Sequence, residues 1–84
     1  MKDQIARTPK LLGAIIRRER RRLGQTQNDL GARIKHRQAT ISKAEAGEPG
    51  TRVGTLLDAL AALNLELVVR PRTKSSPKDI EVLF

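Results

Sequence analysis

The stretch QTQNDLGARIKHRQATISKAEAG, residues 25–47, contains two short helical patterns joined by a polar turn. In the first pattern, Thr26 has the character of an N-cap, and Asp29 follows at the spacing of a capping box. Leu30 and Ile34 are one helical turn apart, so they face the same side. Helices this short are unstable alone. The stretch therefore predicts two helices that depend on tertiary packing.

The second pattern, residues 38–46, separates its apolar and polar side chains. Ile41 and Ala44 point toward the expected core. The opposite face carries Gln38, Ala39, Ser42 and Lys43. A glutamine can form two hydrogen bonds with the edge of adenine, a basic side chain can bind guanine, and an alanine methyl can contact thymine. With the preceding helix crossing the phosphate backbone, this pattern predicts a helix-turn-helix.

We expect base contacts from the second helix and phosphate contacts from its surroundings. The base-contacting set is Arg37, Gln38, Ala39, Ser42 and Lys43, and the phosphate set is Gln27, Lys35 and Thr40. Solvated charges are the alternative interpretation for Arg37 and Lys43. Ala39 and Ser42 have the alternative of being ordinary surface residues.

The preceding residues predict another helix, with Thr8 as N-cap, Pro9 as the first helical residue and Gly24 as the C-terminal cap. Its apolar side holds Leu12, Ile15, Ile16 and Leu23, and its other side holds Arg17, Arg18, Arg20, Arg21 and Arg22. Such a row of like charges favours a polyanionic partner, although a solvated basic face has the same pattern.

After the loop at residues 48–50, Thr51 is expected to cap a fourth helix that ends at Asn64. Its apolar stripe comprises Val53, Leu56, Leu57, Leu60 and Leu63. Residues 65–70, LELVVR, have strand character. The end of the chain, IEVLF at residues 80–84, is interpreted as disordered, a docking segment or a degradation signal, and it also resembles part of a protease site.

Composition limits the class of protein. The 84 residues include no Cys, Trp or Tyr, so they predict one small domain without disulfides or thiolate metal sites. Neither a membrane-length apolar run nor a signal-peptide pattern is present, so a cytoplasmic protein is expected. The formal net charge of +8 favours nucleic acid, with an anionic membrane, an acidic protein or a solubilising surface as alternatives.

Catalysis is not expected, because the sequence shows no nucleophile with a nearby base, no glycine-rich phosphate loop and no metal-binding cluster. His36 is the only histidine and has no candidate ligand partners, so neither a metal nor a cofactor is predicted. The lack of stacking aromatic side chains argues against RNA.

The segments QTQNDLGARI and RQATISKAEAG resemble the phage-repressor and Cro-like (XRE) helix-turn-helix family, over residues 12–63. RQATISKAEAG together with TLLDALAALNLELVVRPR is similar to HipB-like antitoxins of HipA-type Ser/Thr kinase toxins. The resemblance implies a mainly α fold: a four-helix lambda-repressor-like domain with a C-terminal β-strand that pairs across a homodimer. Together with the residue patterns, it gives the expected division of the chain into a loose arm at 1–7, a DNA-binding domain at 8–64, a dimerisation strand at 65–70 and a flexible tail at 71–84.

The resemblance also implies roles for individual residues. Gln27 would brace Gln38 as well as contact phosphate, and Arg20 would form a structural ion pair with Glu45. The strand residues that pair with the second copy would be Leu65, Leu67, Val68 and Val69. The sequence departs from the family pattern at Lys35, which replaces a glycine, at His36 and Gln25, which replace apolar residues, and at Gly31, which replaces an alanine.

The implied function is a sequence-specific repressor that binds palindromic operator DNA as a homodimer, in the cytoplasm at the nucleoid. As the antitoxin of a type II toxin–antitoxin system, it would repress its own operon and bind a HipA-like kinase toxin. One alternative is a stand-alone phage-type or controller-type regulator without a toxin. Another is a protein-interaction module that neutralises a partner and binds little DNA.

Overall fold

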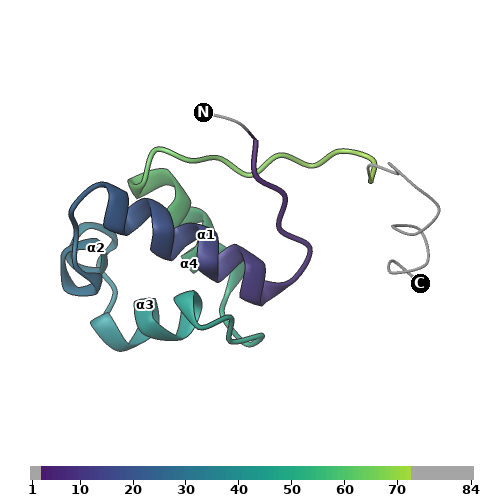
Figure 1. Cartoon of the computed structure of the whole chain (residues 1–84). Coiled ribbons are helices and arrows are strands. Elements are labelled where there is room, and N and C mark those ends of the chain that lie inside the picture. Colours follow the sequence, from purple (N-terminus) through teal and green to yellow (C-terminus); the bar gives the residue numbers. More distant parts are fainter. Residues whose placement is uncertain (1–2, 73–84) are drawn as a thin grey trace.

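The computed structural model describes residues 3–72, which contain four helices: α1 (Pro9–Arg22), α2 (Gln27–Ile34), α3 (Gln38–Glu45) and α4 (Val53–Ala62). Helix α1 runs across the front of the domain, α4 lies behind it, and α2 and α3 follow one another around its side and lower edge (Figure 1). The predicted mainly α, four-helix fold is confirmed. None of the helices within residues 3–72 has the length and hydropathy of a membrane span.

The starts of α1 and α2 follow the sequence prediction. The Leu11 N–H donates to Thr8 Oγ1 at 3.1 Å, and Pro9 is the first residue of α1. At α2, the Asp29 N–H donates to Thr26 Oγ1 at 3.0 Å, and the Thr26 N–H donates to Asp29 Oδ2 at 2.9 Å. The predicted capping box is therefore complete. The hydrogen bond from the Thr26 backbone also lowers the pKa of Asp29.

The core is assembled from all four helical regions. Its fully buried large side chains are Ile16, Leu30, Ile41 and Leu63, joined by Ala59 and Leu60. Complete burial of one such large aliphatic side chain contributes about 1.5–3 kcal/mol. Because Ile41 is the large apolar side chain that α3 buries, that helix keeps its opposite face available for other contacts.

Helix α4 differs from its sequence prediction in two respects. Its N-cap is Arg52 rather than the predicted Thr51. The N–H of Thr51 donates to the Glu48 carbonyl at 3.1 Å and so belongs to the preceding turn. The predicted apolar stripe is also partly wrong, since Val53 is 65% exposed and Leu57 is 43% exposed. The residues that α4 buries are Thr55, Ala59 and Leu60.

Residues 65–72 leave the end of α4 as an extended trace without helix or strand (Figure 1). Leu65 packs against the core, whereas Leu67, Val68 and Val69 are exposed. Because a β-strand needs a neighbour for pairing, the expected strand at residues 65–70 remains a prediction about a second copy. Of the expected tail, residues 73–84 lie outside the described part of the chain.

The N-terminal residues approach α1 and the extended segment. Arg18 donates from its Nη1 atom to Gln4 Oε1 at 3.0 Å, and Asp3 lies 4.0 Å from the guanidinium of Arg70. Both contacts are solvent-exposed, so each contributes little to stability.

Candidate nucleic-acid interface

The turn between α2 and α3 is tight and begins in a left-handed conformation. Lys35 ends α2 with φ 60° and ψ 41°. The N–H of His36 then donates to the Gly31 carbonyl at 2.8 Å, and Arg37 is the N-cap of α3. This backbone path directs the start of α3 away from the core. The side chain of His36 is half-buried, with Nε2 3.9 Å from Asp58 Oδ2 of α4.

The structure brings the predicted base-contacting residues to one side of α3. Ile41, Ala44 and Glu45 are buried on the inner side. On the outer side, the exposed residues are Arg37, Gln38, Ala39 and Lys43, and the half-buried ones are Thr40 and Ser42. Alanine and serine are short, so the middle of α3 can approach a flat or grooved surface closely, with the longer side chains at its beginning reaching further.

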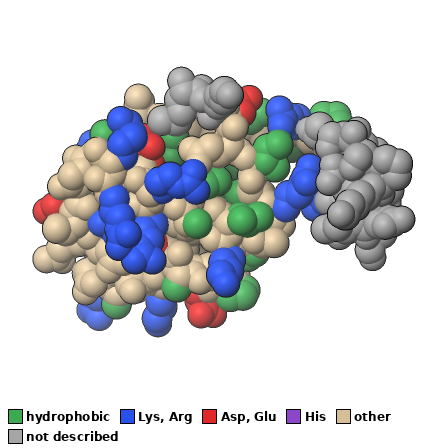
Figure 2. Space-filling model, in the orientation of Figure 1, with side chains coloured by type: hydrophobic (Ala, Val, Ile, Leu, Met, Phe, Trp, Pro, Cys, Tyr) green, Lys and Arg blue, Asp and Glu red, His purple; other side chains and the backbone are tan. Residues whose placement is uncertain are grey.

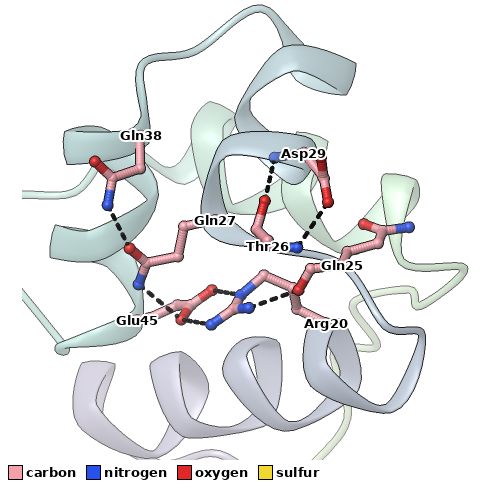
Figure 3. Close-up of polar contacts among 7 residues, drawn as sticks. All are labelled: Arg20, Gln25, Thr26, Gln27, Asp29, Gln38 and Glu45. Carbon is pink, nitrogen blue, oxygen red and sulfur yellow. Dashed lines mark hydrogen bonds and ion pairs between the residues drawn. The ribbon is translucent and has the colours of Figure 1, made fainter.

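Two glutamines connect the start of α3 to the start of α2. Gln38 Nε2 donates to Gln27 Oε1 at 2.8 Å, and Gln27 Nε2 donates to Glu45 Oε1 at 3.2 Å (Figure 3). The bracing of Gln38 by Gln27, which the family resemblance implied, is therefore present. Gln27 is half-buried between its two partners, whereas Gln38 is exposed.

A buried ion pair lies beneath the two glutamines. Arg20 Nε donates to Glu45 Oε2 at 2.6 Å, and Arg20 Nη2 donates to Glu45 Oε1 at 3.0 Å (Figure 3). Arg20 Nη1 donates to the Gln25 carbonyl at 2.7 Å. Both side chains are less than one-tenth exposed. The hydrogen bonds to Glu45 raise the pKa of Arg20. The ion pair expected between these two residues is present, and it joins α1 to α3.

This ion pair corrects the predicted basic face of α1, because Arg20 points into the domain and not toward solvent. Arg22 lies on the exposed side as predicted, with its side chain 59% exposed, and its guanidinium binds the buried carboxylate of Glu19 and thereby lowers the pKa of Glu19. Arg17, Arg18 and Arg21 remain exposed along α1. Figure 2, which has the orientation of Figure 1, shows several Lys and Arg side chains on the face of the molecule where α1 lies.

A shallow polar hollow of about 450 Å³ lies where α2 begins. Its lining comprises Arg20, Arg21, Gln25, Thr26, Gln27, Asn28 and Gln38. The N-terminus of a helix presents unpaired N–H groups and a positive dipole end, both of which favour a phosphate oxygen. The sequence prediction did not include Arg21 and Asn28 among the phosphate contacts. Their proximity to the predicted N-terminus of α2 was the signal that would have identified them.

Gln25 also lines this hollow, but its Oε1 atom is buried without a hydrogen-bond partner among the described residues. The family resemblance placed an apolar residue at this position.

Comparisons with known proteins agree with this geometry. A family model described as helix-turn-helix matches residues 16–69. Among solved structures, the chain is similar to HipB in a complex with the O2 20mer, with 29% identity, a TM-score of 0.78 and coverage of 86% of this chain and 100% of that one. It is also similar to chains from a HipA–HipB–O2–O3 complex and from a HipB–O4 20mer complex, each with 28% identity, a TM-score of 0.78 and coverage of 84% and 100%. A comparison with curated protein sequences gave no match.

Proposed function

Since residues 16–69 match its model, the chain belongs to the helix-turn-helix family, and we propose that it is a sequence-specific DNA-binding repressor acting as the antitoxin of a type II toxin–antitoxin system. Helix α3 would enter the major groove, while α2 would cross the phosphate backbone. The observation that carries this proposal is the position of Gln38: exposed at the first residue of α3 and held there by Gln27.

The proposed base contacts come from Arg37, Gln38, Ala39, Ser42 and Lys43. Gln38 has the geometry for a bidentate contact with adenine, and Arg37 or Lys43 can donate to guanine. Gln27, Lys35 and Thr40 would bind phosphate, together with Arg21 and Asn28 in the hollow at the start of α2. The exposed arginines of α1 add long-range attraction for the duplex.

We further propose that the chain acts as a homodimer on palindromic DNA. Leu67, Val68 and Val69 are exposed in the described single chain, and Val69 is 91% exposed. Pairing of residues 65–70 with the same segment of a second copy would cover these side chains and satisfy the backbone groups. Two recognition helices would then lie roughly 34–36 Å apart, one turn of DNA.

The proposed kinase partner follows from the similarity to a HipB chain solved in a HipA–HipB–O2–O3 complex. That HipB chain is covered along its full length. The chain would therefore bind a HipA-like Ser/Thr kinase and repress the operon that encodes both proteins. If the neighbouring reading frame encodes no such kinase, or if the purified pair does not co-elute in gel filtration, the stand-alone regulator becomes the better assignment.

DNA binding is tested by selection from a pool of random-sequence duplexes, followed by affinity measurements on the best duplex over a range of salt concentrations. We expect a palindromic consensus and a steep loss of affinity with salt, because several phosphates are neutralised. Gln38→Ala should cost about 1–3 kcal/mol and relax the preference at one base pair per half-site. Gln4→Ala, which removes the same type of side chain outside α2 and α3, is the matched control. Failure to select any consensus would contradict the proposal.

A further inference from the structure

We propose that the Glu45 carboxylate determines which polar atoms Gln38 offers to DNA, and that Gln38 thereby selects adenine against guanine. The inference rests on the proposed DNA-binding function. Glu45 is buried and reaches no base itself, so it would act as a positioning residue. The hydrogen-bonded row from Glu45 through Gln27 to Gln38, called here the glutamine relay, carries the argument (Figure 3).

The relay starts at a group that can only accept hydrogen bonds. Both oxygens of Glu45 accept from the guanidinium of Arg20, and Oε1 also faces the side-chain amide of Gln27. A carboxylate that is held in its charged form by a guanidinium repels an amide oxygen and attracts an amide N–H. The nitrogen of Gln27 must therefore face Glu45, which leaves the Gln27 oxygen directed toward α3.

The orientation of the Gln27 amide in turn fixes the orientation of the Gln38 amide. The Gln27 oxygen accepts from Gln38 Nε2 at 2.8 Å, so one of the two N–H groups of Gln38 is already engaged. What remains for a ligand is the Oε1 acceptor and a single N–H donor. Figure 3 shows the Gln38 oxygen turned away from Gln27, at the exposed end of the relay.

This remaining pair of atoms matches one purine better than the other. Adenine offers the N6 donor and the N7 acceptor in the major groove, which complement an amide oxygen and one N–H. Guanine offers two acceptors, N7 and O6. An unrestrained glutamine could turn both N–H groups toward guanine, but the relay withholds one of them and places Oε1 against O6. The relay should therefore act mainly by weakening the binding of duplexes that carry guanine at this position.

The test uses Gln27→Met, which interrupts the relay with a side chain of similar size. Affinity is measured on the duplex selected from the random pool and on its three variants at the base pair where Gln38→Ala removes the preference. We expect the ratio of adenine to guanine affinity to fall roughly three- to tenfold, as expected for one hydrogen bond. If all four duplexes weaken by the same factor, Gln27 is only a phosphate contact and the inference is overturned.

A second variant addresses Glu45 directly. Removal of either charge alone would leave the other buried and unpaired, whereas Arg20→Met combined with Glu45→Met removes both and is tolerated in comparable buried pairs. A thermal melt establishes that the double variant is folded. We expect the ratio of adenine affinity to guanine affinity to fall by the same factor as in Gln27→Met. An unchanged ratio in the folded double variant would show that Glu45 does not set the orientation.

The matched control is Asn28→Ala, which removes a polar side chain from the same hollow but leaves the relay intact. It should weaken binding to all four duplexes alike. In the free protein, the Gln38 side-chain amide should show one proton with slowed solvent exchange by NMR, and Gln27→Met should abolish this difference; equal exchange in both proteins would count against the relay.

The measurements distinguish a wrong role for Gln38 in base recognition from a wrong role for the relay. If Gln38→Ala removes no base preference, the proposed role of Gln38 and the inference are both wrong. If Gln38→Ala removes the preference but Gln27→Met leaves the adenine-to-guanine ratio unchanged, only the inference is wrong.

Discussion

Gly31 and His36 lie with their backbones in contact across the turn of the helix-turn-helix. The His36 N–H donates to the Gly31 carbonyl at 2.8 Å, and a Cβ atom at residue 31 would come within 2.6 Å of the His36 carbonyl oxygen. The family resemblance places alanine at this position and glycine at residue 35. In this chain the glycine lies in the helix, where it permits the close approach, and Lys35 takes the left-handed turn position.

Gly31→Ala is expected to destabilise the domain by about 1–3 kcal/mol, because the added methyl group overlaps backbone that cannot move aside without opening the turn. Urea unfolding measures the change. Gly54→Ala is the control, since it is also helical but has no atom within 4 Å of its would-be Cβ. That substitution should stabilise by about 0.5–1 kcal/mol, and equal effects at both sites would contradict the steric explanation.

Lys35→Gly is expected to stabilise the domain by up to about 1 kcal/mol. The lysine has φ 60°, a conformation that costs a side chain with a Cβ about 1–2 kcal/mol and costs glycine little. Denaturant unfolding tests this result, with Lys43→Gly inside α3 as a control that should destabilise by about 1 kcal/mol. A loss of stability in Lys35→Gly would mean that the lysine side chain makes a compensating contact.

Val68→Pro is expected to weaken the homodimer. Proline removes an N–H donor and is poorly accommodated in a paired strand, and Val68 lies in the middle of residues 65–70. Sedimentation at several protein concentrations measures the association. Val68→Thr keeps both the backbone donor and the branched side chain, so it should retain most of the dimer; an unchanged dimer in the proline variant would contradict strand pairing.

Acidification is expected to weaken the start of α2. The Thr26 backbone N–H stabilises the charged form of Asp29, so the pKa of Asp29 is lowered in the folded protein relative to the unfolded chain. A lowered pKa gives a stabilisation that is complete at neutral pH and is lost as the pH falls from about 4 through the folded-state pKa. Thermal melts between pH 7 and pH 2.5 should therefore show a smaller acid-induced drop in Tm for Asp29→Asn than for the wild type. The same drop in both would contradict this contribution.

Local features of the fold were predictable from the sequence. The Thr8 cap, the capping box at Thr26 and the breaks at Gly24 and Asn64 depend on neighbouring residues, and the structure contains each of them. The outward face of α3 was predictable for a related reason: with Ile41 as its one large apolar residue, the helix has only one side to bury.

The rotation of α4 was not predictable, because its apolar residues cover more of the helix surface than one face needs. Only contact with α2 and the rest of the core shows that Leu60 is buried and that Val53 is exposed. Arg20 is a similar case for local patterns, since it belongs to a run of arginines with the same local character, and only the family resemblance indicated its ion pair with Glu45. Composition and spacing alone do not distinguish the one arginine that meets Glu45.

Among the site residues, the sequence by itself determined which ones lie on the exposed side of α3, since helical spacing around Ile41 is a property of the chain. Tertiary structure alone decided how Gln38 is oriented. The hydrogen-bonded row runs through α2 and α3, from Glu45 to Gln27 to Gln38. The direction of its hydrogen bonds is set by Glu45, which forms an ion pair with Arg20 of α1. The direction of an amide depends on the atoms it meets in space, and those meet only when α1, α2 and α3 are packed together.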